Sequence, residues 1–488
     1  MNNLLGIDLG TSACKVALFA PDGSVVAQAT ADYPVFYPKP GWAEQNPEDW
    51  WQAVQRALHE VLEGVNAADI AGIGVDGQSW SAILMDQAGE VLANTPIWLD
   101  TRATEECELI DRAIGREALF AISGNPVKPC YTLPKILWFR KHLPQMYEKA
   151  AYVLQSNAFL VYRLTGVVTQ DLCQSYGLQC FDMHKGEWNR AILRELNIRE
   201  TLLPPLFACA QVIGGVSEAA ARLTGLKAGT PVVAGGLDAA CGSLGAGVYR
   251  AGQTQEQGGQ AGGMSICVDQ YAADPRLILS RHVVPDCWLL QGGTVGGGGA
   301  LKWLRAQLCP ELGFEEMGEL ARTVAAGSEG LVFLPYLAGE RSPIWDVNAK
   351  GVFYGLDFTK TRAHMIRAVM EGVAYSLRHN LEVAAEAGAK AEMLYAMGGS
   401  ANSQVWTQIK SDVTGCAIEV PASDTATTLG AAMLAGVGMG VYDSFEAAVR
   451  QTVQLKRAHA PNEANRATYD REYQRYRELY ERLKEFEQ

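Results

Sequence analysis

The stretch that decides how the chain begins to fold is Leu4–Phe19, LLGIDLGTSACKVALF. Two apolar runs, LLGID and CKVALF, flank a Gly-Thr-Ser turn, and a second turn at Pro21–Gly23 leads into VVAQAT. Short apolar runs separated by turn residues are typical of neighbouring antiparallel strands. The chain is therefore predicted to open with an antiparallel meander, with Asp8 at the end of its first, buried strand.

A helix and a further buried strand are predicted next. Asn46 and Pro47 suit the cap and the first turn of a helix from about Glu48 to Leu62. The segment 70–77, IAGIGVDG, is a short apolar run that ends at a glycine turn, as a buried strand does. Strand, helix and strand in this order indicate a mixed or parallel sheet, and hence an α/β fold.

Three later segments share a pattern of apolar strand, glycine-rich turn and helix. They are 230–247 (TPVVAGGLDAACGSLGAG), 289–304 (LLQGGTVGGGGALKWL) and 393–413 (MLYAMGGSANSQVWTQIKSDV). Glycine lets the backbone approach a ligand closely, and the helix that follows points its N–H groups at an anion. Each turn is therefore a candidate ligand-binding loop, and both halves of the chain carry one.

Length and composition indicate two large domains, because the chain has 488 residues and 48% hydrophobic content. The boundary is predicted in the glycine-rich stretch 245–252, which gives domains 1–247 and 248–488. A charged helix from about Asn462 carries one aromatic face, which is predicted to dock on its own domain rather than on a partner helix.

Charge and composition exclude several classes of protein. A formal net charge of −13 argues against nucleic acid or an anionic membrane surface as a partner. The N-terminus MNNLLGIDLG lacks the basic region of a secretory signal, and no run approaches the ~18 apolar residues of a membrane span. The eleven cysteines show no metal-ligand or redox spacing. These features predict a cytoplasmic protein with reduced thiols.

Asp8 is followed by a turn whose amides and hydroxyls are predicted to be unpaired. That geometry suits a phosphate chain with Mg²⁺. The residues of the turn, with the cation just beyond it, are Gly10, Thr11, Ser12 and Lys15. A hairpin turn in which Asp8 caps its own backbone is the structural alternative.

Asp238 is predicted at a strand-to-helix turn, because it lies between VVAGGL and a run of small residues. In phosphoryl transfer one carboxylate accepts the proton of the attacking hydroxyl, while the rest of the protein positions groups and neutralises charge. Two strand-end aspartates beside glycine loops supply that combination. For Asp238 alone, a helix N-cap is the competing interpretation.

Several aromatic and polar side chains are further candidates for binding a sugar. Trp42, Trp80 and Trp98 lie in or beside predicted loops, where an aromatic platform or simple core packing would each explain them. The polar residues that follow strand-like runs are Gln78, Asp100 and Arg102. They can hydrogen-bond hydroxyl groups, although surface turns would explain them equally well.

Together these segments resemble the FGGY family of carbohydrate kinases over nearly the whole chain. CYTLPKILWFRKH at 130–142 is similar to the first family signature, although Cys130 replaces its usual residue type. GVFYGLDFTKTRAHMIRAVMEG at 351–372 is similar to the second. Within the family the likeness is closest to the xylulose kinases, through PGWAEQNPEDWW (40–51), GERSPIWDVNAKGVFYGL (339–356) and MGGSANSQVWTQIKSDVTG (397–415).

The resemblance implies two actin-like (ribonuclease H-like) α/β ATPase domains, with ATP in a cleft between them and the sugar mainly against the first. It implies ATP and Mg²⁺ as cofactors, Asp238 as the catalytic base and Asp8 as the metal ligand, and it allows a homodimer. The residues implied to face the nucleotide are Gly10, Thr11, Ser12, Lys15, Gly259, Gly298, Gly398, Gly399 and Asn402. Those implied to face the sugar are Gln78, Ser79, Trp80, Asp100, Arg102 and Asp238.

Two departures from the xylulose kinase pattern bear on the substrate. Ser79-Trp80 stands where those enzymes carry Met-His after Gly-Gln, and Gln260-Ala261 replaces the usual Thr-Ser of a phosphate-facing turn. An indole offers only a donor where an imidazole offers a donor and an acceptor. Because one hydroxyl in a polar site can change specificity by several powers of ten, this exchange can redirect the enzyme to another polyol.

The leading hypothesis is an ATP-dependent kinase that converts D-xylulose to xylulose 5-phosphate. Another ketose, a polyol or a sugar acid is the alternative acceptor. An actin-like ATPase with a conformational output and a sugar-responsive regulator are hypotheses of different classes. The two signature-like stretches argue against the ATPase, and no basic or helix-turn-helix segment supports the regulator.

Overall fold

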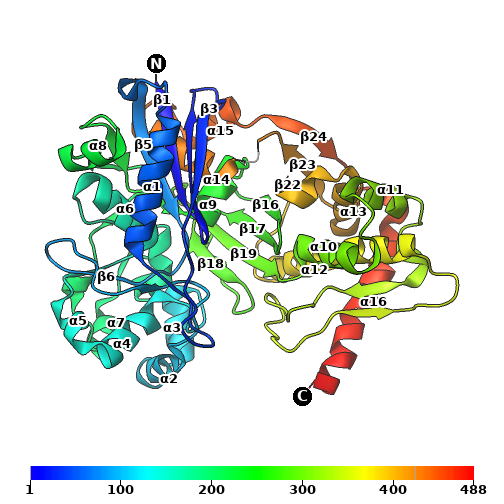
Figure 1. The fold of residues 1–488 in the computed structure, drawn as a ribbon. Helices are drawn as coiled ribbons and strands as arrows, with labels where there is room; N and C mark the ends of the chain where they lie inside the picture. Colours follow the sequence, from blue (N-terminus) through cyan, green and yellow to red (C-terminus); the bar gives the residue numbers. More distant parts are fainter. Residues whose placement is uncertain (1, 424, 488) are drawn as a thin grey trace. The chain divides into compact units, whose positions relative to one another are not determined.

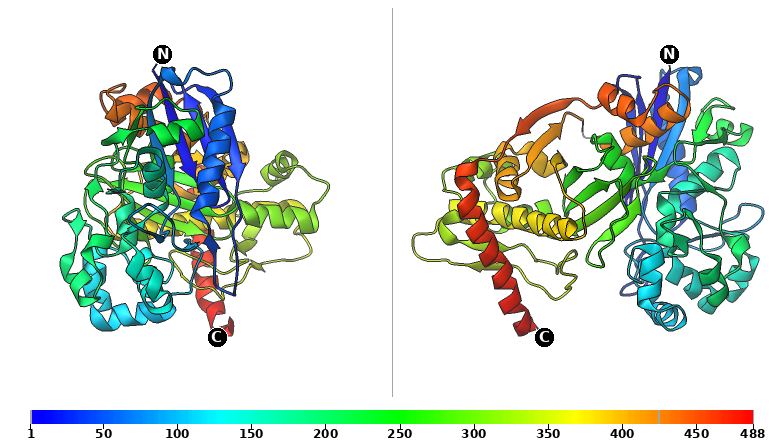
Figure 2. Two further views of the ribbon diagram at one scale, coloured as in Figure 1. Left: turned by 60° about the vertical axis from the view of Figure 1, so that its left-hand side comes forward. Right: turned by 180° about the vertical axis from the view of Figure 1, so that it is seen from behind.

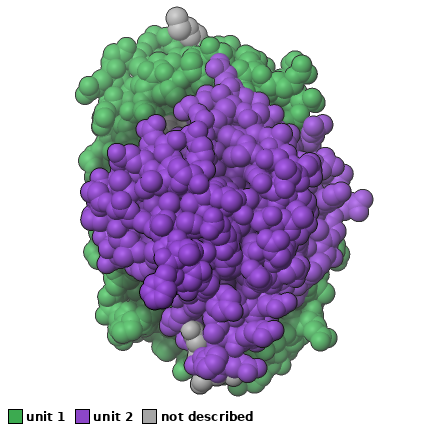
Figure 3. Space-filling model, turned by 90° about the vertical axis from the view of Figure 1, so that its right-hand side faces the viewer, with its two compact units in different colours: residues 1–249, 279–288, 425–453 green, residues 250–278, 289–424, 454–488 purple. Residues whose placement is uncertain are grey.

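The computed structural model describes residues 2–423 and 425–487. The chain forms two compact units, coloured separately in Figure 3. The first unit comprises residues 1–249, 279–288 and 425–453, and the second comprises 250–278, 289–424 and 454–488. The predicted boundary at 247/248 divides the chain into contiguous halves, whereas these units are discontinuous. One reason is that helix α14 (Ala426–Gly438) packs on the sheet of the first unit, which brings residues 425–453 into this unit.

The first unit is built on a mixed sheet whose strand order is β13-β14-β5-β1-β2-β3. Strands β1 (Asn3–Leu9), β2 (Ala13–Phe19) and β3 (Val25–Asp32) form the predicted antiparallel meander, which is thereby confirmed. Strand β5 (Ile70–Gly77) lies parallel to β1 over its full length, as predicted for an α/β sheet.

Beyond β5 the sheet continues with short strands from a distant part of the chain. Strands β14 (Pro231–Val233) and β15 (Gly236–Leu237) both run parallel to β5. Strand β13 (Val212–Gly215) pairs antiparallel with β14 and is the outermost strand on this side. Three parallel strands, β1, β5 and β15, therefore end at the same edge of the sheet.

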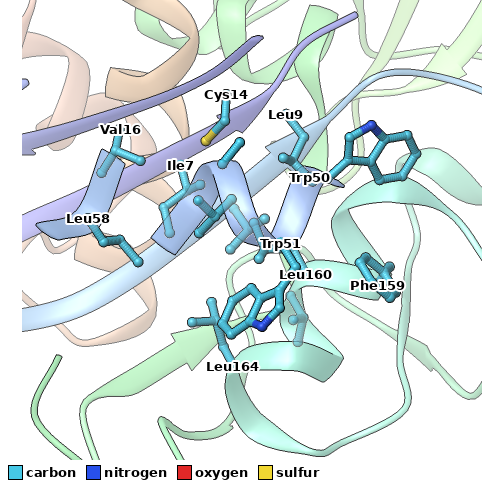
Figure 4. Close-up of a cluster of buried hydrophobic side chains, with 14 of the residues drawn as sticks. Ile7, Leu9, Cys14, Val16, Trp50, Trp51, Leu58, Phe159, Leu160 and Leu164 are labelled. Carbon is cyan, nitrogen blue, oxygen red and sulfur yellow. The ribbon is translucent and has the colours of Figure 1, made fainter. Parts of the chain in front are cut away.

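Helices cover both faces of this sheet (Figures 1 and 2). Helices α1 (Pro47–Val61) and α6 (Ser156–Thr165) pack on one face, and α9 (Asp238–Gly245) and α14 lie on the other. The Asn46 side chain caps α1 by accepting from the Glu48 N–H group, which confirms the predicted start of this helix. Figure 4 shows the core on this side, where Ile7 and Leu9 of β1 face the tryptophans of α1.

On the opposite face, glycines without side chains allow α14 to lie directly on the strands. A Cβ atom on Gly6 would lie 1.9 Å from the Thr428 carbonyl oxygen, and one on Gly74 would lie 1.8 Å from that of Ala431. Any side chain at these positions would push the helix away. The alternation of a strand then places Asp8, two residues after Gly6, on the same face as α14.

The first unit also contains a helical region between β7 (Thr95–Pro96) and β13. It contains α2 (Thr104–Ala113), α3 (Arg116–Ser123), α4 (Thr132–His142) and α5 (Pro144–Lys149). Helix α4, which carries the first signature-like stretch, is buried along most of its length and contributes to an apolar cluster that it shares with α2, α3 and neighbouring segments.

The second unit has a mixed sheet in which the strands follow the order β19-β17-β16-β22-β23-β24. Their bounds are β16 (Gln253–Gly258), β17 (Gly262–Val268), β19 (Trp288–Thr294), β22 (Met393–Met397), β23 (Ala417–Pro421) and β24 (Leu455–His459). Strand β19 leads into α10 (Gly297–Leu308), and β22 leads through Gly399–Asn402 into α13 (Gln404–Thr414). Both predicted strand, glycine turn and helix segments of this half are confirmed.

Two long helices complete the core of the second unit. Helix α12 (Arg362–Glu386) packs on α10, α13 and α11 (Phe314–Arg322). The C-terminal helix α16 (Arg466–Leu483) buries Tyr469, Tyr473 and Tyr476 against Tyr375 of α12. The aromatic face of the C-terminal helix therefore docks on its own unit, as predicted.

No helix in residues 2–423 and 425–487 is both long enough and apolar enough to cross a membrane.

The contact between Gly74 and α14 generates a first prediction. Gly74→Ala is expected to lower the free energy of unfolding by roughly 1–3 kcal/mol, because its new methyl group would overlap the Ala431 carbonyl. Urea unfolding followed by circular dichroism measures this loss. Gly214→Ala is the matched control, since it lies in the same sheet and its Cβ would meet nothing closer than Val167 Cγ2 at 3.6 Å. Equal losses in both variants would contradict the prediction.

Candidate active site

Three aspartates lie where the parallel strands of the first unit end. Asp8 in β1 and Asp76 in β5 are direct neighbours in the strand register. Asp76 also pairs in register with Gly236 of β15, and Asp238 follows this strand as the first residue of α9. The sheet therefore brings together carboxyl groups from three distant parts of the chain.

Asp238 does not cap α9 from the N-cap position, which Leu237 occupies. Its Oδ1 accepts a hydrogen bond of 2.6 Å from the Ala239 N–H group, and the residue remains partly exposed. The competing N-cap interpretation of Asp238 is therefore wrong. The carboxyl group keeps an oxygen that can accept a proton from a ligand.

The electrostatics of this edge favour protonated carboxyl groups. Burial and the nearby charge of Asp8 raise the pKa of Asp238 to about 7. Burial, together with the charges of Asp8 and Asp238, holds the pKa of Asp76 well above its usual range. Burial also raises the pKa of Asp8, although a hydrogen bond with Asp76 and the charge of Lys15, its neighbour in register on β2, oppose the shift. A bound cation would relieve this repulsion.

Asp76 was not predicted from the sequence as a site residue. It is fully buried, with the carboxyl of Asp8 beside it, and no donor within the described residues satisfies its oxygens. The signal was present, because GVDG at 74–77 repeats the glycine, aliphatic residue and aspartate of GIDLG at 6–10. Both segments end parallel strands at the same edge.

The donor set at this edge fits Mg²⁺ better than a metal held by protein alone. No group of three or more His, Cys, Asp or Glu side chains in the described chain forms a complete metal site. Mg²⁺ usually takes only one or two carboxylates and fills its other positions with water and phosphate oxygens. Asp8 and the unsatisfied Asp76 supply carboxylates of that kind.

The turn after β1 is held by contacts to its backbone. Gly10 N–H donates to the Ala13 carbonyl, and the Tyr33 hydroxyl donates to the Gly10 carbonyl at 2.5 Å. Thr11 Oγ accepts from Trp98 Nε1 at 2.9 Å. Ser12 and Lys15 are exposed, so their side chains are accessible to a ligand.

The predicted sugar-binding turn after β5 is largely buried. The Gln78 amide donates to Gln45 Oε1 at 2.8 Å, and its own Oε1 is buried without a partner among the described residues. Ser79 is partly exposed. Trp80 packs its ring on Tyr131 at 4.4 Å, and its buried Nε1 makes no hydrogen bond within the described residues, although the Tyr176 hydroxyl lies near.

Asp100 and Arg102 pair with each other in the interior of the first unit. Arg102 Nε lies 2.9 Å from both oxygens of Asp100, and its Nη2 forms an ion pair with Glu44 at 2.8 Å. The guanidinium also lies over the ring of Trp42. Gln78 and Asp100 are buried and the side chain of Arg102 is only 3% exposed, so the surface-turn interpretation of these residues is wrong.

The second unit contains a pocket with a volume of about 890 Å³. The predicted nucleotide residues Gly259, Gly298, Gly399 and Asn402 line it, and Gly398 adjoins Gly258 in its wall. Gly298 N–H donates to the Gly259 carbonyl at 2.8 Å, and a Cβ on Gly298 would lie 2.4 Å from that oxygen. A Cβ on Gly399 would meet nothing within 4 Å. The glycine loops thus pack against one another and expose backbone to the pocket.

The other walls of the pocket were not predicted from the sequence. Helix α10 contributes Leu301 and Lys302, and the first side chains of α11 include Phe314 and Glu315. Arg322 lies at the other end of α11. No local motif marks α11, because its role depends on how it packs against α12 and α13. A cavity of this size, lined by exposed glycine backbone and an exposed aromatic ring, suits a nucleotide.

The predicted site residues therefore form two groups. The first unit holds Asp8, Gly10, Thr11, Ser12, Lys15, Gln78, Ser79, Trp80, Asp100, Arg102 and Asp238. The second unit holds Gly259, Gly298, Gly398, Gly399 and Asn402.

Comparison with known proteins gives consistent matches. The model of the FGGY family of carbohydrate kinases, N-terminal domain, matches residues 3–245, and that of the C-terminal domain matches 274–439. The chain is 33% identical to xylulose kinase of Bacillus subtilis over 99% of this chain and 98% of that protein, and 32% identical to xylulose kinase of Escherichia coli K12 over 98% and 99%. The crystal structure of xylulose kinase from Rhodospirillum rubrum is similar with a TM-score of 0.93 at 31% identity, covering 99% of each chain.

The crowded carboxyl groups generate a second prediction. Because the pKa of Asp76 is raised on folding, the folded state holds this proton more tightly, and stability is lost as the pH rises through the folded pKa. In the absence of divalent cations, Asp76→Asn is expected to raise the melting temperature by several degrees at pH 8 and by less at pH 5. Thermal unfolding at the two pH values measures the difference.

Asp86→Asn is the control for this prediction. Asp86 accepts from the Glu90 N–H group at 3.0 Å, which lowers its pKa, so the substitution is expected to lower the melting temperature slightly. An equal gain at both pH values for Asp76→Asn would contradict the prediction.

Proposed function

This chain belongs to the FGGY family of carbohydrate kinases, and from that premise we propose that it transfers the γ-phosphate of ATP to D-xylulose, giving xylulose 5-phosphate. It is a sugar kinase of this family over nearly its full length. The choice of D-xylulose is supported by the names of the xylulose kinases to which it is similar in sequence and structure.

The observation that carries the proposal is the position of Asp238 beside Asp8 and Asp76. A general base works best when its pKa lies near the working pH. The pKa of Asp238, raised to about 7, meets this condition. In the proposed reaction the sugar hydroxyl gives its proton to Asp238 while its oxygen forms the new bond to the γ-phosphorus and the bond from phosphorus to the ADP oxygen breaks.

The sugar is proposed to lie against the turn after β5. Gln78 Oε1 is a buried acceptor and Trp80 Nε1 a buried donor, each without a partner among the described residues. Hydroxyl groups of a sugar can satisfy both, because each hydroxyl donates and accepts. Asp100 and Arg102 are proposed to support this site, since their ion pair fixes the loop in which they lie.

The nucleotide is proposed to occupy the pocket of the second unit. The loops around Gly259, Gly298 and Gly399 expose backbone there, and α10 begins beside them, as phosphate-binding sites require. Gln260 lines the same pocket, so the departure from Thr-Ser at 260–261 is proposed to alter contacts to the nucleotide rather than to the sugar. Gly10, Thr11, Ser12 and Lys15 are proposed, by likeness to the family, to bind phosphate.

Mg²⁺ is proposed to be held by Asp8 with Asp76, where it would neutralise charge on the phosphates. All eleven cysteines are free thiols, which is compatible with the proposed cytoplasmic location. A homodimer is proposed from likeness to the family alone. Another ketose, a polyol or a sugar acid remains the alternative acceptor, because Ser79 and Trp80 differ from the xylulose kinase pattern.

A coupled assay of ADP release with MgATP tests the substrate. D-xylulose is expected to give the highest kcat/KM in a panel of ketopentoses, aldoses, polyols and sugar acids, each measured against a blank without sugar. Faster turnover of another compound would show that the protein is a kinase whose preferred substrate is that compound rather than D-xylulose. ATP hydrolysis that does not depend on sugar would contradict the proposal.

Asp238→Asn tests the base. The substitution is expected to lower kcat by a factor on the order of 10²–10⁴, because the amide cannot accept the hydroxyl proton, while the Kd of ATP measured by calorimetry changes less than twofold. Asp182→Asn is the control, since this carboxylate of the same unit accepts from the backbone of His184 and Lys185. Near-normal turnover by Asp238→Asn would remove Asp238 from the mechanism.

A further inference from the structure

Trp80, in the proposed sugar-binding turn, has a backbone conformation that tryptophan rarely adopts. Its φ angle is +62°, in the left-handed region that favours glycine. A bulky residue stays there only when neighbouring groups hold it, and such positions cluster at ligand sites. The contacts that hold Trp80 therefore also decide how its indole is presented to a ligand.

The start of α4 supplies these contacts. Lys135 Nζ donates to the Trp80 carbonyl at 2.8 Å, and Thr132 Oγ donates to the next carbonyl, that of Ser81, at 3.2 Å. The ring of Tyr131 packs on the indole at a centroid distance of 4.4 Å. Three residues in the first turn of α4 or just before it thus hold the carbonyl groups of Trp80 and Ser81 and the indole ring of Trp80 in place.

Lys135 also joins this turn to the phosphate-facing turn. Its Nζ donates a second hydrogen bond of 2.7 Å to the Ile97 carbonyl. The next residue, Trp98, donates from its indole to Thr11 Oγ. One ammonium group therefore connects the segment at 78–81, which holds the proposed sugar residues, to the segment that contacts Thr11.

The chemistry of Lys135 is unusual for a residue that serves only packing. The side chain is fully buried, and both of these hydrogen-bond partners are neutral carbonyl groups. Burial lowers its pKa to about 7. An apolar side chain such as methionine would fill the same space without the penalty of burying a charge. The ammonium is therefore explained by the two carbonyls that it holds in place.

We propose that Lys135 is a positioning residue for sugar specificity, which holds Trp80 in its left-handed conformation and so determines which sugar the site accepts. This inference rests on the proposed function. It assigns no contact between Lys135 and the substrate. Without the ammonium, the Trp80 peptide is free to relax to an ordinary backbone conformation, and the indole leaves its position.

Lys135→Met tests the inference, with Lys141→Met as the matched control. Lys141 lies in the same helix but is exposed and pairs with Glu105. Lys135→Met is expected to raise KM for D-xylulose at least tenfold, to leave KM for MgATP within twofold, and to reduce the kcat/KM ratio between D-xylulose and the other ketopentoses at least fivefold. Its melting temperature is expected to fall by a few degrees, because the Trp80 and Ile97 carbonyls lose their donor. Lys141→Met is expected to match the wild type in every value.

A merely structural role for Lys135 would raise both KM values together and leave the ratio between sugars unchanged, and that result would overturn the inference. Thr132→Val, which removes only the hydrogen bond to Ser81, serves if Lys135→Met does not fold. It is expected to change the same ratio in the same direction, by at least twofold, and an unchanged ratio would overturn the inference. Absence of sugar-dependent turnover in the wild type would overturn the proposed function and this inference with it, whereas an unchanged ratio in active variants overturns this inference alone.

Discussion

The structure of the first unit depends on the parallel alignment of β1, β5 and β15. Parallel strands end at one edge, and this edge collects Asp8, Asp76 and Asp238 from positions far apart in the chain. Their charges repel one another, so the backbone must hold them together against that repulsion. The glycines of β1 and β5 let α14 pack directly on one face of the strands, and this close packing helps to hold the sheet together. The acidic edge and the close helix contact are thus two results of the same alternation along the strands.

Much of this arrangement could be predicted from the sequence because it depends on local patterns. Short apolar runs between turn residues indicated the meander, and Asn46-Pro47 indicated the start of α1. The position of Asp8 at a strand end follows from the same runs. Glycine turns between strands and helices indicated binding loops in both halves, and in the second unit four of the five predicted glycine and asparagine residues line one pocket.

What could not be predicted depends on contacts between distant segments. GVDG at 74–77 repeats the pattern around Asp8, but that repeat alone does not show that the two carboxyl groups lie together, which requires β1 to lie beside β5 in register. The side chains of α11 line the pocket because of tertiary packing, without any motif. The domain boundary could not be predicted for the same reason. Nothing in residues 425–453 alone indicates that their helix α14 packs on the sheet of the first unit rather than on that of the second.

The path of the chain between the two units has a consequence for folding on the ribosome. The polypeptide passes from one unit to the other at 249/250, 278/279, 288/289, 424/425 and 453/454. The sheet of the first unit emerges early, but α14, which covers one of its faces, is synthesised only after most of the second unit. Until then the glycine face of β1 and β5 lacks its cover, and contacts of such long sequence separation form slowly. Nascent chains of this protein therefore pass through a long interval in which this face of the sheet lacks the helix that covers it in the folded protein.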